Sequence, residues 1–181
     1  MQIDRNRIID KNQGFILKKV NDFSAFQSFS CGDTDLNDFI RNDAEKHRNE
    51  LLAETYVLML QRADVPVAFC SLCNDAIQFS KDQKSFLPEK KRYPYQPSVK
   101  IARLGVDENY QKKNIGTYLI GLIKHFFIAD NRTGCRFITV DAYNEDRVLA
   151  FYRKNDFQFL NHKDVKKLTR TMYFDLKRLI T

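Results

Sequence analysis

The stretch of sequence that most constrains the fold runs from Lys100 to Phe127 and reads as a strand, a turn and a helix in succession. Residues 101–106 are largely apolar and predict a buried strand, whereas residues 107–114 are almost wholly polar. From Ile115 onward, apolar residues recur at the spacing of a helix. The first turn of such a helix presents backbone N–H groups and a positive dipole end. The turn before it is therefore expected to bind an anion, most often phosphate.

The rest of the chain predicts a sheet with helices packed on it. A helix and a hairpin come first, and strands then alternate with helices. We therefore expect an α/β (α+β) fold with a mixed central sheet of about six to seven strands and helices on both faces. Basic and aromatic residues interleave in the irregular stretch 80–98, which leaves open a nucleic-acid contact or a loop pinned to the body. The expected strands are 14–20, 54–61, 65–74, 101–106, 136–142, 157–160 and 171–176, and the expected helices are 36–51, 115–127 and 145–154.

Composition limits the class of protein. The 181 residues suit a single domain, residues 1–181, and 43% of them are hydrophobic, which is enough for a sizeable core. No apolar run approaches the length of a membrane span, and residues 1–15 are too polar for a signal peptide, so a cytoplasmic location is expected. The net charge of +7 suits a polyanionic partner such as a nucleotide cofactor, RNA or DNA, and equally a plain solvated surface.

The cysteines and histidines give little support for a metal centre. Cys70 and Cys73 form a CxxC pair inside an apolar run, where positions three apart on a strand face opposite sides of a sheet. A redox or metal role requires both sulfurs to converge, so we expect two small buried thiols instead. His47, His125 and His162 have no metal-ligating residue at ligand spacing, so no metal is expected.

The turn after the central strand carries a further signal, the run Gln-Lys-Lys-Asn-Ile-Gly at residues 111–116. Further along, residues 137–160 contain a strand, an asparagine, a helix and the segment FYRKNDF. Together these stretches resemble the GNAT superfamily of acetyl-CoA-dependent N-acetyltransferases, whose turn has Gln or Arg, two residues, Gly, one residue, then Gly or Ala. The chain departs from this pattern at Asn114 and Asp156, which stand where the family usually has glycine. Asparagine is the next best residue in a left-handed turn.

The resemblance implies acetyl-CoA as co-substrate and a role for each matching residue. The strand backbone at Leu104, Gly105 and Val106 would hold the pantetheine arm and the acetyl carbonyl, and Asn144 would contact the pantetheine. Tyr152 would be the general acid that protonates the leaving thiolate, which suits a phenol with a reference pKa of about 10. An aromatic ring that fills the layer between helix and sheet is the other interpretation of this residue. The pyrophosphate would be cradled by backbone N–H groups from Gln111, Lys112, Lys113, Asn114, Ile115, Gly116 and Thr117.

No general base is evident in the sequence. Many members of the family carry a glutamate on the central strand, but residues 99–106 include no acid. Glu54, Asp75 and Asp141 are candidates by strand position only, and each is as readily structural. A lysine amine, with a pKa of about 10.4, needs more help to lose its proton than an α-amine at about 7.7–8.0. The missing carboxylate therefore favours an α-amine acceptor, or a base that acts through water.

The first half of the chain bears on the acceptor. Residues 29–47 and 97–107 resemble a GNAT subgroup that includes toxins acetylating the α-amine of aminoacyl-tRNA, which DNA-binding antitoxins neutralise. The main prediction is an N-acetyltransferase in which a primary amine of a small molecule or protein terminus attacks acetyl-CoA directly. One alternative is a tRNA-acetylating toxin with a small antitoxin partner, and another is a non-catalytic acyl-CoA-binding module. The apolar segment Met172–Ile180 also leaves a homodimer open.

Overall fold

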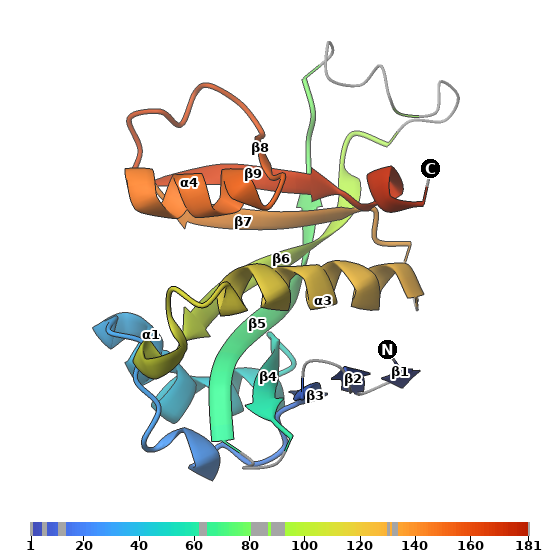
Figure 1. The fold of residues 1–181 in the computed structure, drawn as a ribbon. Coiled ribbons are helices and arrows are strands. Elements are labelled where there is room, and N and C mark those ends of the chain that lie inside the picture. The colour runs from blue at the N-terminus through green and yellow to red at the C-terminus, as the bar shows by residue number, and fades with distance from the viewer. Residues whose placement is uncertain are drawn as a thin grey trace. The chain divides into compact units, whose positions relative to one another are not determined.

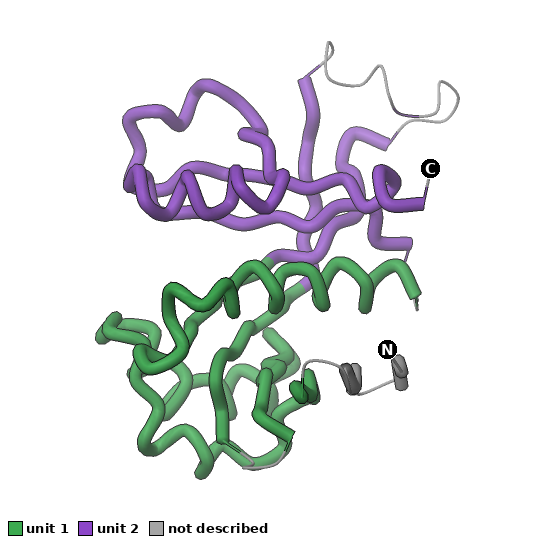
Figure 2. The backbone as a smooth tube through the Cα atoms, in the orientation of Figure 1, with its two compact units in different colours: residues 1–73, 101–130 green, residues 74–100, 131–181 purple. Residues whose placement is uncertain are grey.

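The chain forms two compact units in a computed structural model that describes residues 2–4, 7–10, 14–61, 65–80, 87, 93–129, 131 and 134–180. Unit 1 comprises residues 1–73 and 101–130, and unit 2 comprises residues 74–100 and 131–181 (Figure 2). Two long strands, β5 (Val65–Ile77) and β6 (Gln96–Val106), each contribute residues to both units. The strands follow the order β1-β2-β3-β4-β5-β6-β7-β9-β8 (Figure 1).

Unit 1 contains an antiparallel run of strands and most of the helices. The predicted strands β3 (Phe15–Lys19) and β4 (Glu54–Leu60) pair with each other, and β4 pairs with β5 across a bulge at Leu58/Met59. Pro66 lies at the beginning of β5, as predicted. Two short strands that the sequence did not suggest, β1 (Gln2–Asp4) and β2 (Arg7–Asp10), extend this run. The helices are α1 (Thr34–Asp38), a π-helical turn (Phe39–Asp43), α2 (Ala44–Asn49) and α3 (Ile115–Ala129).

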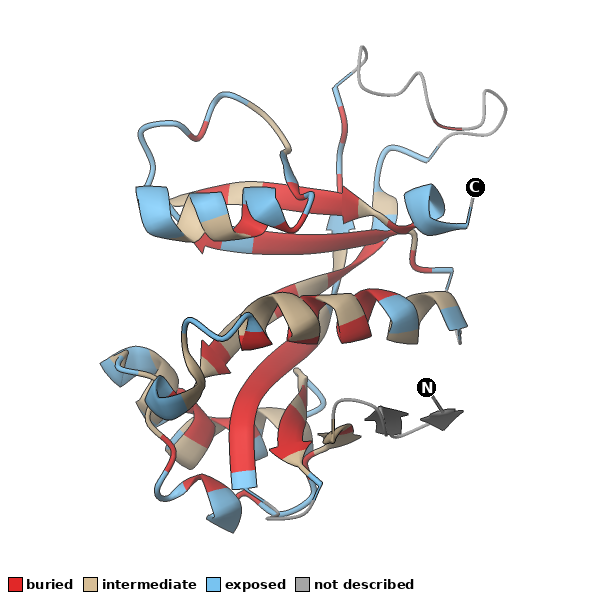
Figure 3. Cartoon of the chain, in the orientation of Figure 1, coloured by how far each residue is buried: buried red, intermediate tan, exposed pale blue. Residues whose placement is uncertain are grey.

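Helices cover both faces of the strands in unit 1, and successive residues of β4 contact helices on opposite faces. Val57 and Met59 belong to a buried cluster with Phe39 and other residues of the α1–α2 region. The intervening Tyr56 instead packs edge-on against Phe126 of α3, with ring centroids 5.4 Å apart. Figure 3 shows the resulting buried stripe along β4 and β5. The predicted placement of helices on both faces is confirmed for this unit.

Unit 2 contains the parallel pair that makes the sheet mixed. β7 (Phe137–Tyr143) pairs in parallel with β6 over three residues of each strand, 98–100 and 137–139, and runs antiparallel to β9 (Thr169–Asp175). β8 (Gln158–Phe159) forms the outer antiparallel strand, and α4 (Asp146–Lys154) connects β7 to β8. All seven strands predicted from the sequence are therefore present, with antiparallel and parallel pairing as expected.

Three details differ from the sequence predictions or lie outside the described residues. β6 begins at Gln96, so the predicted 80–98 loop gives way to strand earlier than expected. Residues 62–64, 81–86 and 88–92, which include the predicted hairpin turn and most of that loop, are not among the described residues. The C-terminal segment suggested for subunit contact is largely internal, because Met172, Tyr173, Phe174 and Leu176 are buried, whereas Leu179 and Ile180 are exposed.

Candidate functional site

The turn that follows β6 is built as the sequence predicts, and it lies entirely in unit 1. The carboxylate of Asp107 accepts the N–H of Asn109 at 3.0 Å and so begins a short 3-10 helix at Glu108–Tyr110. Helix α3 then begins at Ile115, and the carbonyl of Asn114 accepts the Tyr118 N–H at 2.9 Å. Backbone N–H groups in the first turn of a helix point away from its body, so α3 faces the turn with its positive end.

Two residues of this turn have a left-handed backbone without being glycine. The φ angle is 60° at Asn114, which confirms the prediction for that position, and 60° at Lys112, which the sequence did not indicate. Asparagine adopts this conformation more readily than most residues, while lysine has no such preference. The loop therefore keeps at Asn114 the left-handed path that a glycine would allow.

The side chain of Gln111 holds the turn in place from within. Its Nε2 donates to the carbonyl oxygens of Val106 at 3.0 Å and Cys31 at 2.8 Å. The ammonium group of Lys113 also contacts the turn, since its Nζ donates to the Asn109 carbonyl at 2.9 Å. Both Lys112 and Lys113 are exposed. The side chains of Gln111 and Lys113 thus shape the turn, and the anion contact predicted for it would fall to its backbone N–H groups and to Lys112.

The strand positions predicted to bind the pantetheine lie at the end of β6. The pairing of β6 with β7 extends only to Lys100, so Leu104–Val106 lie beyond it. Gly105 is required by packing as well, because an added Cβ would come within 2.6 Å of the Phe69 ring. Any side chain there would force the core of unit 1 to shift.

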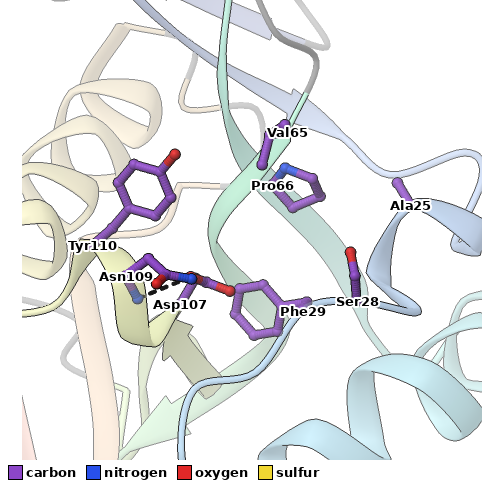
Figure 4. A pocket seen from close by; sticks show the side chains of 8 residues that line it. All are labelled: Ala25, Ser28, Phe29, Val65, Pro66, Asp107, Asn109 and Tyr110. Atoms are coloured by element: carbon purple, nitrogen blue, oxygen red, sulfur yellow. Dashed lines mark hydrogen bonds between the residues drawn. The ribbon is translucent and has the colours of Figure 1, made fainter.

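A pocket of about 330 Å³ opens beside the start of this turn, and sequence reasoning missed it. Phe29, Val65 and Pro66 give it an apolar wall, and Figure 4 shows Asp107 and Asn109 hydrogen-bonded to each other on the other side. Its lining combines three separate segments, which no local sequence pattern reveals. The lining residues are Ala25, Ser28, Phe29, Val65, Pro66, Asp107, Asn109 and Tyr110.

In unit 2, Asn144 does not cap α4 as predicted. The helix begins at Asp146, and its N-cap residue, Glu145, makes no capping side-chain bond. The Nδ2 of Asn144 instead donates to the carbonyls of Val165 at 2.8 Å and Lys167 at 3.0 Å. The side chain of Asn144 is therefore bound by the loop between β8 and β9 and not by the end of α4. Both bonds use its amide nitrogen, and its amide oxygen takes part in neither.

Tyr152 lies in α4 and is 7% exposed. Its ring meets Phe151 and Phe157 edge-on, with centroids 5.1 and 5.4 Å away. The helix closes through Asp156, whose φ of 64° confirms the predicted left-handed turn. These aromatic contacts fix the position of the ring, and the catalytic role of its hydroxyl stays a prediction.

The three candidate bases are all engaged by other side chains. Glu54 pairs with Lys19 at 2.7 Å, and Asp75 accepts the Thr139 hydroxyl at 2.6 Å.

Asp141 accepts bonds from Lys100 at 2.9 Å and from Thr171 at 2.7 Å. Burial acts to raise the pKa of Asp141, but these hydrogen bonds and the Lys100 charge hold the pKa below its ordinary value. A carboxylate stabilised in this way is a weak base.

Neither the thiols nor the helices point to another kind of site. Burial raises the pKa of Cys70 well above the usual range, so this residue stays a protonated thiol. In the part of the chain that the structure describes, no group of three or more His, Cys, Asp or Glu side chains is arranged to hold a metal ion. No helix among those residues is long and apolar enough to cross a bilayer.

Comparisons with known proteins show the family and the fold of the chain. Residues 53–159 match the family described as "Acetyltransferase (GNAT) domain", and this range covers more than half of the chain. A comparison with curated protein sequences found no match.

The solved structures that resemble this chain do so over nearly its whole length. A tyrosine-to-phenylalanine mutant of KacT has a TM-score of 0.77 at 19% identity, over 93% of this chain and 98% of that one. AtaT complexed with acetyl-methionyl-tRNAfMet has a TM-score of 0.76 at 20% identity, over 92% and 97%. AtaTR bound with acetyl-CoA has a TM-score of 0.73 at 20% identity, over 93% and 99%. These likenesses confirm the predicted fold class.

Proposed function

Because the chain belongs to the family of GNAT acetyltransferase domains, we propose that it transfers the acetyl group of acetyl-CoA to the α-amine of an aminoacyl-tRNA. The observation that carries this proposal is the likeness to AtaT complexed with acetyl-methionyl-tRNAfMet, which extends over 92% of this chain. This acceptor replaces the small-molecule or protein amine as the leading interpretation. The chain is a GNAT N-acetyltransferase in either case.

The co-substrate would bind along the end of β6 and at the turn. AtaTR has been solved bound with acetyl-CoA, which supports the same ligand here. The backbone of Leu104–Val106 would pair with the pantetheine, and the turn from Gln111 to Thr117 would receive the pyrophosphate. The left-handed backbone at Lys112 and Asn114 supports this assignment, because it lets successive N–H groups converge on one anion.

The reaction needs no nucleophile from the protein. The neutral α-amine attacks the thioester carbonyl carbon, and a backbone N–H of β6 stabilises the developing oxyanion. The C–S bond then breaks, and the thiolate takes a proton from the Tyr152 hydroxyl. The attacking nitrogen releases one proton to water as the amide forms, and a proton from water restores the Tyr152 phenol. Structures of KacT and AtaT with one tyrosine replaced by phenylalanine support a tyrosine in this role.

The engaged carboxylates favour an acceptor that loses its proton easily. Glu54, Asp75 and Asp141 each hold a neighbouring side chain, and Asp141 is a weak base. An α-amine, with a reference pKa of about 7.7–8.0, is substantially neutral near pH 8 without help, whereas a lysine amine is not. The net charge of +7 further suits a polyanionic acceptor such as tRNA.

The non-catalytic alternative loses its main support. That alternative rested on the two replaced glycines, but Asn114 and Asp156 both adopt the left-handed backbone that glycine would supply. AtaT has also been solved bound to the C-terminus of the antitoxin AtaR, so a small antitoxin is the protein partner we propose.

A panel of acceptors tests the proposal. Labelled acetyl-CoA is offered with aminoacyl-tRNAs, free amino acids, a peptide with a free N-terminus, and a polyamine. We expect label to enter aminoacyl-tRNA alone, and transfer to stop when the α-amine is blocked beforehand. If label enters a peptide or a small amine while charged tRNA stays unlabelled, the acceptor is a small-molecule or protein amine and not aminoacyl-tRNA. Expression of the wild-type chain, but not of Tyr152→Phe, should arrest growth.

A further inference from the structure

The segment Ser30–Cys31, which lies just before α1, is hydrogen-bonded to the turn that follows β6. The backbone carbonyl of Ser30 accepts the Glu108 N–H at 2.8 Å, and its hydroxyl donates to the Glu108 carboxylate at 2.6 Å. The Ser30 N–H donates to Asp107 at 3.3 Å, and the Cys31 carbonyl accepts from Gln111 at 2.8 Å. All of these residues belong to unit 1, and we call this set of four bonds the clamp.

The clamp is itself anchored to the first helix. The side-chain oxygen of Asn37 in α1 accepts the Cys31 N–H at 2.9 Å, and its Nδ2 donates to the Ser30 hydroxyl at 3.4 Å. Gly32, with a φ of 78°, lies against Glu108, since an added Cβ would come within 3.3 Å of that carboxylate. The segment is therefore packed against Glu108 of the turn on one side and hydrogen-bonded to Asn37 of α1 on the other.

The turn requires such support because its backbone is unfavourable by itself. Lys112 and Asn114 both have a φ of 60°, a conformation that L-residues avoid. Conformations of this kind persist where the surroundings over-determine them. The clamp reaches the turn at Asp107, Glu108 and Gln111, immediately before these two residues.

We propose that Ser30 and Gln111 are positioning residues that hold the turn in its phosphate-receiving shape, and so set the affinity for acetyl-CoA without taking part in the chemical step. This inference rests on the proposed binding of the CoA pyrophosphate at the turn. It assigns a physical role to the Ser-Cys-Gly-Asp run at residues 30–33, which also forms part of the subgroup resemblance. A turn that is already ordered costs the ligand less on binding.

Ser30→Ala tests the clamp, with Ser24→Ala as its matched control. Ser24 is an exposed serine six residues before Ser30, and its hydroxyl donates to the nearby Asp22 at 2.8 Å. Calorimetry gives the dissociation constant of acetyl-CoA, and displacement gives that of S-acetylpantetheine, which lacks the pyrophosphate. Neither measurement needs an acceptor. We expect Ser30→Ala to weaken acetyl-CoA binding by up to about 10-fold, because the ligand must then order a turn that has lost a hydrogen bond to a charged group. Binding of S-acetylpantetheine should be unchanged.

Two further variants keep the test decisive. Ser30→Thr retains the hydroxyl and should restore affinity, while Gln111→Met keeps the length of the side chain, loses both donated bonds, and should weaken acetyl-CoA binding at least as much as Ser30→Ala. Equal weakening of both thioesters, or unchanged acetyl-CoA affinity in folded variants, would overturn the proposal. A wild-type protein that fails to bind acetyl-CoA would overturn the cofactor assignment as well. Normal acetyl-CoA binding without transfer to tRNA would overturn only the proposed acceptor.

Discussion

The turn in unit 1 and the α4 region in unit 2 use their residues in opposite ways. In the turn, the side chains of Asp107, Glu108 and Gln111 hold the loop through hydrogen bonds, so the proposed anion contact would fall to the backbone. In unit 2, the backbone of α4 has no predicted part in the reaction, and the predicted chemistry depends on one side chain, Tyr152. A site made of backbone tolerates replacement wherever φ is kept, which explains how Asn114 stands in for glycine. A site made of one hydroxyl tolerates no replacement.

Removing that hydroxyl should have the largest effect. Tyr152→Phe keeps the ring contacts with Phe151 and Phe157, so the melting temperature should barely change. Loss of a general acid lowers kcat by about 10²- to 10⁴-fold. Steady-state kinetics with acetyl-CoA should show that fall in kcat with an unchanged KM for acetyl-CoA.

The kcat of Tyr152→Phe distinguishes a general acid from a residue that only fills space. A variant that keeps its rate would reduce Tyr152 to an aromatic of the layer between helix and sheet. Phe151→Leu serves as the control, since it disturbs the neighbouring ring without removing a hydroxyl.

A negative charge in the first turn of α3 should have the next largest effect. Thr117→Glu favours the helix, whose N-terminus attracts acids, but repels a pyrophosphate. Two like charges about 4 Å apart near a protein surface repel by about 4 kcal/mol, so acetyl-CoA should bind at least about 100-fold more weakly. Calorimetry measures this, with Thr117→Gln as the uncharged control. Undiminished binding by a folded Thr117→Glu protein would remove the pyrophosphate from this turn.

Asn114 and Asp156, the left-handed positions at which the family usually has glycine, allow a direct comparison between the units. Alanine at Asn114 or at Asp156 should each cost about 1 kcal/mol of stability, because alanine is strained at positive φ. Only Asn114→Ala should also weaken acetyl-CoA binding, and glycine at either position should restore what alanine loses. Thermal melts and calorimetry on the four variants make the comparison. Equal effects on binding from both alanines would erase the distinction between backbone site and helix end.

The smallest effect concerns the polar group around Asp141. Its folded-state pKa is lowered, so the stability that it contributes is present above its ordinary pKa of about 3.9 and is lost as pH falls through the lowered value. The side chain is 42% exposed, so solvent screening should keep the contribution below about 1 kcal/mol. Asp141→Asn should flatten the acid limb of a stability-against-pH curve slightly. A steeper limb in the variant would contradict the assigned sign.

Local sequence patterns predicted the helices and strands because the spacing of apolar residues differs between the two. The apolar stripe after Ile115 and the apolar run of β4 were enough to place helix and strand. The left-handed turns at Asn114 and Asp156 were predictable from residue type together with the family resemblance, which usually has glycine at both positions.

The features that were missed depend on distant partners. Ser30 and Glu108 are 78 positions apart, and Asn144 reaches the carbonyls of Val165 and Lys167 rather than its own helix. Such bonds leave no period in the sequence, and neither does a pocket lined by three separate segments. The positive φ of Lys112 was equally hidden, because surroundings rather than residue type impose it.

The chemical identity of the acetylated product tests the central claim most directly. Charged tRNA is incubated with the protein and acetyl-CoA and digested with ribonuclease, and the 3′-terminal nucleoside is analysed by mass spectrometry. The proposal predicts N-acetyl-aminoacyl-adenosine from the wild-type protein and a strongly reduced amount from Tyr152→Phe. Acetyl-CoA consumption with unmodified aminoacyl-adenosine as the sole 3′-terminal product would contradict it.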